Sequence, residues 1–554
     1  MLKTKITSSL EKAFPDARIG EYPTLKTLSA LKGERVSVQF LYTYERPDPN
    51  THLYPVRSKP TLSGSLAEYA NLRAVMHIPV SLTTHAEGYD DNMLKVTPGL
   101  FPDVLDEIHY DGSLTLTPDE LFSVWVEIEL PKDIGAGEHT LVIDVDFGNR
   151  GMAHEEVTID VINATLPEED IYFTQWFHAD CLANYYRVDV WSEEHWRIVE
   201  NFARVARKNG INTLLTPVFT PPLDTAVGGE RRTTQLVGVT VTDGKYTFDF
   251  SLLDRWVAMC DRVGIENFEI SHLFTQWGAE HAPKIMATVD GEYKKIFGWD
   301  TSATSEEYKT FLRQFVSELL LHLKKDGNDK RCIFHISDEP SIDHLENYKA
   351  AKAILADLLD GYMIVDALSR IQFYNTGALA HPIPASNHIE DFLKANIDGL
   401  WTYYCVSQWK GVSNRFHSMP AWRNRSIGMQ IYKYNIKGFL HWGYNFYNNQ
   451  FSDSPINPYL ETSTGHGFPG GDAYSVYPGN NGECLESMRI KVFYEALQDI
   501  KAMKLCESLY SKEEVVAAIE EAFGGEVRFN VCARSAKQML AVREKINSMI
   551  KAKV

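Results

Sequence analysis

Residues 192–217, SEEHWRIVENFARVARKNGINTLLTP, contain one amphipathic helix followed at once by one strand. Ser192 is a favoured N-cap before an acidic first turn, and Gly210 suits the left-handed end of a helix. The following segment, INTLLTP, is short and apolar and ends at a proline, which is typical of a buried strand. A helix that leads directly into a buried strand is the repeating unit of a parallel α/β fold.

The same unit recurs along the chain from about residue 171. Amphipathic helices such as residues 251–264 and 305–325 separate short apolar runs. Eight strands alternating with helices over about 340 residues favour a closed (β/α)8 TIM-type barrel over an open sheet. The predicted strands are residues 171–178, 211–217, 265–274, 331–339, 362–369, 399–405, 438–446 and, most weakly, 472–478.

The two ends of the chain differ from this pattern. Near the N-terminus, β-branched and roughly alternating stretches such as residues 35–44 and 137–148 lie between Gly, Pro and Asp turns, which predicts an N-terminal β-sandwich. The last residues are helical and charged. The predicted organisation is a β-sandwich over residues 1–167, a barrel over 168–508 and a helical C-terminal extension over 509–554.

The composition narrows the classes of function. The formal net charge is −19 at pH 7 without a dense Lys/Arg run, which argues against nucleic acid as a partner. No apolar run reaches 18 residues and the first residues lack a signal-peptide core, so we expect no membrane association and a cytoplasmic location. Seven widely spaced cysteines suit reduced thiols. Aromatic residues form 12% of the chain, a surplus that a sugar-binding cleft would use.

Polar and aromatic residues gather at the ends of the predicted barrel strands. Active sites of such barrels lie where the strands end and the following loops begin, so these positions favour a functional cleft over a set of unrelated core residues. The candidate ligand-binding residues are His178, Asp180, His272, Trp277, His335, Tyr403, Tyr404, Trp442, Asn445 and Tyr447.

The segment FHISDEPS, residues 334–341, places two consecutive acids at the end of the fourth predicted strand. Taken alone, Asp338-Glu339 before Pro340 would suit the start of a helix. At a barrel mouth the pair instead suits acid–base chemistry. Adjacent acids do not easily stand on opposite sides of a glycosidic bond, as the two carboxylates of most glycosidases do. The pair therefore suggests a reaction in which the substrate's own 2-acetamido oxygen attacks the anomeric carbon.

Two other functions stay open on the sequence. Glu269 or Asp366, on neighbouring predicted strands, could be a nucleophile about 5 Å from Glu339, which would give a two-carboxylate retaining glycosidase acting on another β-glycoside. The second alternative is a carbohydrate-binding protein without catalysis.

Neither a cofactor nor a metal is expected. Residues 465–470, GHGFPG, satisfy the pattern G-x-G-x-x-G, but they do not link a strand to a helix as dinucleotide binding requires. We expect this segment to form a wall of the cleft, with Asp472 near sugar hydroxyls. The 18 histidines show no metal-ligand spacing.

Six segments, in this order, resemble glycoside hydrolase family 123: QWFHADCLANYY, TPPLDTAVGGER, EISHLFTQWGA, FHISDEP, LWTYYC and GFLHWGYNFYN. The resemblance covers the whole barrel and, more loosely, the N-terminal β-rich region. It implies a retaining, exo-acting β-N-acetylgalactosaminidase that removes terminal β-linked GalNAc, as found on glycosphingolipid oligosaccharides, through an oxazoline intermediate.

The resemblance also implies roles for individual residues. Asp338 would polarise the acetamido group and Glu339 would be the general acid and base. Other sugar-facing residues implied in this way are Tyr403 or Tyr404, Trp277, Trp401 and Trp442. A carbohydrate is the one expected partner. The natural aglycone, the preference between GalNAc and GlcNAc and the oligomeric state stay open.

Overall fold

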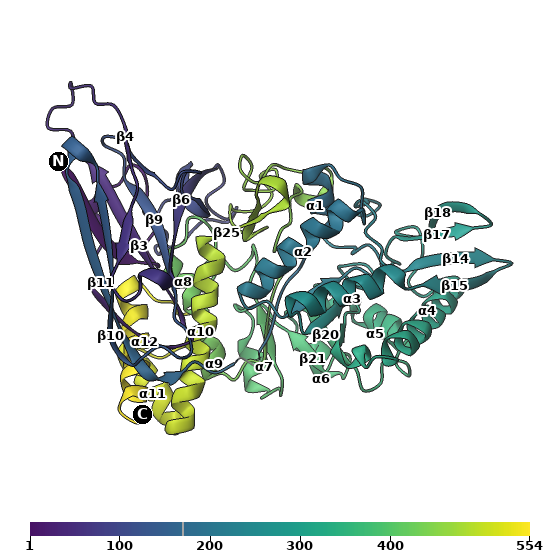
Figure 1. Cartoon of the computed structure of the whole chain (residues 1–554). Helices are drawn as coiled ribbons and strands as arrows, with labels where there is room; N and C mark the ends of the chain where they lie inside the picture. Colours follow the sequence, from purple (N-terminus) through teal and green to yellow (C-terminus); the bar gives the residue numbers. More distant parts are fainter. Residues whose placement is uncertain (169–170) are drawn as a thin grey trace.

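The computed structural model describes residues 1–168 and 171–554. A mainly antiparallel sandwich lies at one end of the molecule, a parallel barrel occupies the middle, and the C-terminal helices return to the sandwich (Figure 1). The predicted fold class is therefore confirmed. Residues 169–170, at the start of the predicted barrel domain 168–508, lie outside the described residues.

The sandwich is built from two sheets whose alternating apolar residues face one another. Val38, Phe40, Val126, Ile143 and Ile159 belong to the core between the sheets. The larger sheet has the order β1 (Leu2–Ser8), β3 (Arg35–Tyr44), β9 (Phe122–Glu129), β6 (Ala70–Val80), β7 (Gly99–Glu107), β25 (Cys484–Ser487) and β24 (Val476–Pro478). The smaller has the order β2 (Thr27–Lys32), β11 (Met152–Thr165), β10 (Gly137–Asp146) and β5 (Thr61–Ser63), and a separate pair joins β4 (Val56–Ser58) to β8 (Leu114–Leu116).

Eight parallel strands form the barrel. In chain order they are β12 (Tyr172–Gln175), β13 (Thr213–Thr216), β16 (Asn267–Ile270), β19 (Cys332–Phe334), β20 (Met363–Ala367), β21 (His381–Ile383), β22 (Trp401–Tyr403) and β23 (Gly438–His441). β12 pairs with both β13 and β23, which closes one side. Between β21 and β22 the sheet is joined by a single parallel bridge, Ala385 to Tyr403.

One predicted barrel strand is wrong, and one barrel strand was not predicted. The weak eighth strand at 472–478 is wrong, because residues 476–478 are β24, which pairs with β25 and joins the sandwich through β7. The sixth barrel strand is instead β21, which the sequence does not reveal. It has only three residues, and its central Pro382 is a residue type that strand interiors avoid.

Helices cover the outside of the barrel. α2 (Glu193–Lys208) begins at the predicted cap, where the Ser192 side chain accepts a hydrogen bond from the His195 amide. Gly210 has φ +86°, and a Cβ there would lie 2.5 Å from Leu497. The other helices are α1 (Ala179–Tyr186), α3 (Ser251–Val263), α4 (Glu306–Lys324), α5 (Leu345–Ala353), α6 (Gln372–Asn375), α7 (Glu390–Lys394), α8 (Ala421–Arg425), α9 (Ile427–Lys433) and α10 (Met488–Leu509).

A four-stranded sheet extends from the barrel at the end opposite the sandwich (Figure 1). It consists of β15 (Lys245–Asp249), β14 (Gly238–Thr242), β17 (Ile285–Val289) and β18 (Glu292–Phe297). Its strands lie in the loops that follow the second and third barrel strands.

Buried ion pairs join the sandwich to the rest of the chain. Arg489 of α10 contacts Asp103 of β7 at 2.8 Å, and Lys491 contacts Glu127 of β9 at 2.7 Å. The last two helices, α11 (Lys512–Phe523) and α12 (Ala536–Lys551), share a hydrophobic core with α10 and with sandwich residues. Since each of these charges is paired where water is excluded, the contacts fix the orientation of the two parts. The domain boundaries stay a prediction.

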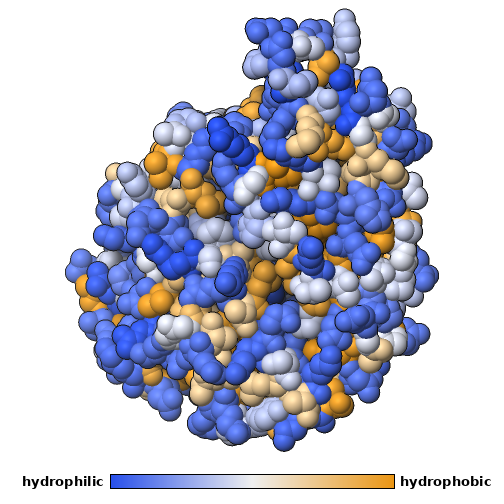
Figure 2. Space-filling model, turned by 90° about the vertical axis from the view of Figure 1, so that its left-hand side faces the viewer, coloured by the Kyte–Doolittle hydropathy of each residue, from blue (hydrophilic) through white to orange (hydrophobic). Residues whose placement is uncertain are grey.

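The outer face of the sandwich end is largely hydrophilic, with apolar residues interspersed among polar ones (Figure 2). Among the described residues, no helix is both long and apolar enough to cross a bilayer.

Candidate active site

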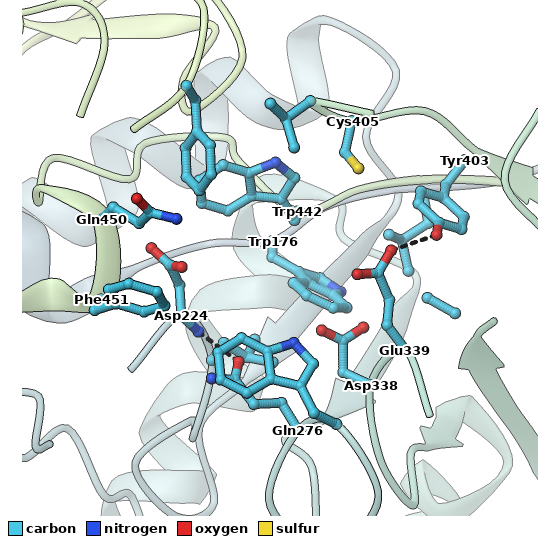
Figure 3. Close-up of a pocket in the computed structure, with 16 residues that line it drawn as sticks. Trp176, Asp224, Gln276, Asp338, Glu339, Tyr403, Cys405, Trp442, Gln450 and Phe451 are labelled. Carbon is cyan, nitrogen blue, oxygen red and sulfur yellow. Dashed lines mark hydrogen bonds between the residues drawn. The ribbon is translucent and has the colours of Figure 1, made fainter. Parts of the chain in front are cut away.

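A cavity of about 190 Å³ opens at the carboxyl ends of the barrel strands. Its walls come from the loops after six of the eight strands, so residues far apart in the sequence meet in one place (Figure 3). The lining residues are Trp176, Leu223, Asp224, Gln276, Trp277, Asp338, Glu339, Ala367, Tyr403, Cys405, Val406, Leu440, Trp442, Gln450, Phe451 and Phe468.

The acid pair lies just beyond β19 and faces this cavity (Figure 3). The Glu339 amide donates to the Ala367 carbonyl at 2.9 Å, and the Asp338 carbonyl accepts from the Trp277 amide at 2.7 Å. The next helical turn, Ile342–His344, has Ser341 at its N-cap. The pair is therefore not used as a helix cap.

The two carboxyl groups share one electrostatic environment. Burial and the neighbouring Glu339 charge raise the pKa of Asp338 well above its usual range. The Tyr403 hydroxyl, at the end of β22, donates a hydrogen bond to Glu339 Oε1. Two adjacent acids resist ionising together, and the direction of this shift favours the protonated form of Asp338. A retained proton is what a general acid must supply.

Strained backbone concentrates around the cavity. Asp224, Trp277, Glu339 and Phe451 all line it and all have positive φ, between +43° and +66°. Such a conformation costs a non-glycine residue of order 1–3 kcal/mol, and it persists only where surrounding contacts impose it. Strain of this kind is typical of a functional site.

Comparison with known proteins identifies the family. A model of the glycoside hydrolase 123 catalytic domain matches residues 176–506, which is more than half of the chain. The chain belongs to glycoside hydrolase family 123. No curated protein matches it.

The structural comparison supports the fold of this family 123 hydrolase. A family 123 glycoside hydrolase from Clostridium perfringens, described in a study of glycolipid glycan hydrolysis, superposes with a TM-score of 0.75 at 15% identity. The match covers 100% of this chain and 98% of the other. A family 5 mannosidase from Rhizomucor miehei superposes with a TM-score of only 0.31 at 12% identity, and the match covers 60% of this chain and 94% of the other.

The two rival carboxylates are held in the barrel interior. Glu269 accepts hydrogen bonds from Trp176 Nε1 and from His335 Nε2, both at 2.7 Å. Asp366 contacts His335 Nδ1 at 3.2 Å and accepts the Ile336 amide at 3.0 Å. Neither carboxylate lines the cavity, and both form hydrogen bonds to other residues of the barrel.

His335 holds this interior network together. Burial alone would lower the pKa of His335, but its hydrogen bonds to Asp366 and Glu269 raise that pKa to about 9. This shift favours the imidazolium form of the ring, which lies between the Asp366 and Glu269 side chains. Because Glu269 also binds Trp176, the network fixes one aromatic wall of the cavity.

His272 stacks on His335 with ring centroids 4.4 Å apart, and neither of its ring nitrogens has a hydrogen-bond partner among the residues that the structure describes. Ligand atoms of His272, His335 and Asp366 lie within 4.8 Å of one another. These three residues could hold a metal only if His335 gave up a carboxylate contact.

Four predicted ligand-binding residues lie behind the cavity wall rather than on its surface. Asp180 pairs with Arg231 at 2.6 Å, and Arg231 also donates to His178 Nδ1 at 3.0 Å. Asn445 accepts the His178 amide at 2.9 Å, and the Tyr447 hydroxyl donates to a carbonyl oxygen of β24. These side chains hold the loops of the hydrolase in place.

Two further predicted residues are also buried elsewhere. Trp401, at the first position of β22, stacks on Tyr172 at 5.1 Å and fills the opposite end of the barrel. Tyr404 donates its hydroxyl to Asn424 at 2.8 Å. Of the residues selected from the sequence, five line the cavity: Trp277, Asp338, Glu339, Tyr403 and Trp442.

The cavity contains residues beyond those predicted from the sequence. Trp176, Asp224 and Gln276 lie within the segments that carry the family resemblance, so the signal was present. Phe468, from the glycine-containing segment 465–470, forms part of the wall, as expected of that segment. Asp472 accepts a hydrogen bond from Trp442 Nε1 at 3.0 Å and so supports the wall from behind.

Proposed function

We propose that this family 123 hydrolase is an exo-acting, retaining β-N-acetylgalactosaminidase that uses the 2-acetamido group of its substrate as the nucleophile. The observation that carries the proposal is the adjacent pair Asp338-Glu339, which faces the cavity from one strand end. Two adjacent acids reach one side of a sugar but do not straddle the scissile bond. The nucleophile is therefore supplied by the substrate.

The first step forms an oxazoline. The substrate N–H donates to Asp338, which favours the ionised form of that carboxyl group, and the proton that Asp338 gives up passes to Glu339. The acetamido oxygen attacks C1 while Glu339 protonates the departing glycosidic oxygen. The C1–O bond to the leaving group breaks, and the cyclic intermediate forms on the face opposite to it.

The second step consumes water. The Glu339 carboxylate takes a proton from water, the oxygen of that water attacks C1, and the oxazoline ring opens. Two inversions at C1 give retention. We assign the acetamido carbonyl to Tyr403, because its hydroxyl lies beside Glu339 in the cavity, whereas the Tyr404 hydroxyl donates to Asn424.

The aromatic cavity surface supports a sugar as substrate. Trp176, Trp277, Trp442, Phe451 and Phe468 present apolar faces that pack against the C–H surface of a pyranose. Glycolipid glycans, on which the Clostridium perfringens relative acts, are the class of substrate we propose. Seven free cysteines suit a reducing compartment, and we propose the cytoplasm.

The test is the rate of p-nitrophenol release from aryl β-glycosides of GalNAc, GlcNAc, galactose and glucose. GalNAc should be the best substrate, and successive fluorination of its N-acetyl group should slow the reaction progressively. A rate that does not respond to fluorination would refute the mechanism. Glu339→Gln should lower kcat/KM by about 10²–10⁴-fold, while Asp343→Asn, an exposed acid nearby, is the matched control.

Asp224 is a candidate nucleophile for a two-carboxylate mechanism, because it lines the cavity together with Asp338 and Glu339. A 2-deoxy-2-fluoro glycoside that labelled Asp224 would establish that mechanism instead.

A further inference from the structure

Asp224 is held in a conformation that its own sequence does not favour. It lies in the loop after β13 with φ +46°. Its amide donates to Gln276 Oε1 at 2.7 Å, and its carbonyl accepts the Ser452 hydroxyl at 2.8 Å. Two other loops therefore fix the backbone of Asp224, and the side chain is directed into the cavity (Figure 3).

The Asp224 carboxylate lacks a full set of hydrogen bonds. Its Oδ2 atom is buried and accepts no hydrogen bond from any residue within 1–168 or 171–554. The nearby cation, Arg231, donates instead to Asp180 and His178. A buried oxygen of this kind is costly unless a ligand supplies a donor.

The surroundings of Asp224 restrict the chemistry of that donor. Leu223, Trp442, Phe451 and Phe468 supply mostly carbon surface to this cavity. Burial raises the pKa of Asp224 to about 6, which leaves the carboxyl group mainly ionised at neutral pH. An ionised carboxylate accepts hydrogen bonds only, so the matching ligand group is a hydrogen-bond donor, which on a sugar ring is a hydroxyl.

Resting on the proposed function, we infer that Asp224 is the residue that reads the sugar hydroxyls at C4 and C6. The acid pair must face C1 and the C2 acetamido group, and Asp224 lies on the other side of the cavity (Figure 3). In a pyranose, the edge opposite the C1–C2 bond carries the 4-hydroxyl and, through C5, the 6-hydroxyl. Since GalNAc and GlcNAc differ only in configuration at C4, Asp224 determines the specificity between them.

The test is a thermodynamic cycle, in which the Asp224 carboxylate and the sugar hydroxyl are removed separately and together. The enzyme changes from wild type to Asp224→Asn, and the aryl β-GalNAc substrate loses its 4-hydroxyl or its 6-hydroxyl. Asparagine tolerates positive φ, so the loop conformation is retained. Asp326→Asn, an exposed acid that follows α4 and does not line the cavity, removes the same charge and should leave the rate unchanged.

We expect wild type to lose on the order of 10²-fold in kcat/KM when the contacted hydroxyl is removed. On the complete substrate, kcat/KM of the Asp224→Asn variant should fall by a similar factor. Removing the hydroxyl from the substrate should then lower kcat/KM of this variant by less than about a further threefold. It should also lose its preference for GalNAc over GlcNAc. Independent, multiplying losses on both deoxy substrates would overturn the inference while leaving the proposed function intact.

A wild-type enzyme without turnover would refute the proposed activity but would still permit this test. Calorimetric titration of wild type and Asp224→Asn with methyl β-GalNAc and its deoxy analogues gives the Kd values for the same thermodynamic cycle. Coupling between Asp224 and one hydroxyl would then support the inference, and an absence of coupling or of any sugar binding would overturn it.

Discussion

Replacing Asp224 by asparagine should stabilise the protein in a pH-dependent manner. Burial raises the pKa of this carboxyl group from 3.8 to about 6, against the opposing effects of Arg231 and the Phe451 backbone. Asparagine has nearly the same shape but cannot ionise. The variant therefore removes the cost of keeping a charge in the cavity, and it does so without leaving a cationic side chain unpaired, because Arg231 bonds to Asp180.

The magnitude follows from the two pKa values. As the pH rises, the unfolded chain loses this proton around 3.8 and the native protein only around 6, so wild-type stability falls across that interval. The accumulated cost is about 1 kcal/mol at pH 4.5 and levels off at about 3 kcal/mol by pH 8. Asp224→Asn should therefore be more stable than wild type by amounts that grow in the same way.

Urea unfolding followed by tryptophan fluorescence at pH 4.5, 6 and 8 would measure this difference. The comparison requires equal m values for the two proteins. Asp326→Asn, on the surface, should differ from wild type by less than about 0.5 kcal/mol at every pH. An Asp224→Asn variant that is no more stable than wild type at pH 8, or whose advantage is greatest at pH 4.5, would refute the reasoning. The gain in stability should accompany the loss of activity described above, as is common where a binding residue is strained.

Three further substitutions test the rest of the site. Tyr403→Phe removes the hydroxyl that contacts Glu339 and should lower kcat/KM by about 10²-fold, as loss of one transition-state donor does; an unchanged rate would contradict the proposed role. Trp442→Phe should raise KM by about tenfold with little change in kcat, since it removes stacking area that substrate and transition state share; a selective fall in kcat would argue against simple stacking. Glu269→Gln deprives the His335 imidazolium of one carboxylate and should cost about 3–5 kcal/mol of unfolding free energy, measured by urea at pH 7; a cost below 1 kcal/mol would show that the pair is not a buried ion pair.

Most of the barrel could be predicted because its strands and helices carry local signals. The helix at residues 193–208 has a serine cap, an acidic first turn and a glycine after its end, and the structure places all three as expected. β21 carries no such signal. Its three residues pair with β20 in the ladder and are joined beyond their end to β22 by one bridge, so their strand conformation is imposed by their neighbours.

The sequence by itself determined the alternation of strands and helices, the β-rich start of the chain and the position of Asp338-Glu339 at a strand end, because each depends on residues close together in the chain. Only the tertiary structure decided which strand-end side chains reach the cavity. His178 and Asp224 both follow barrel strands, yet His178 is turned into a buried network while contacts from two distant loops hold Asp224 toward the cavity. Those contacts join residues 52 to 267 positions apart, so no local sequence pattern can reveal them.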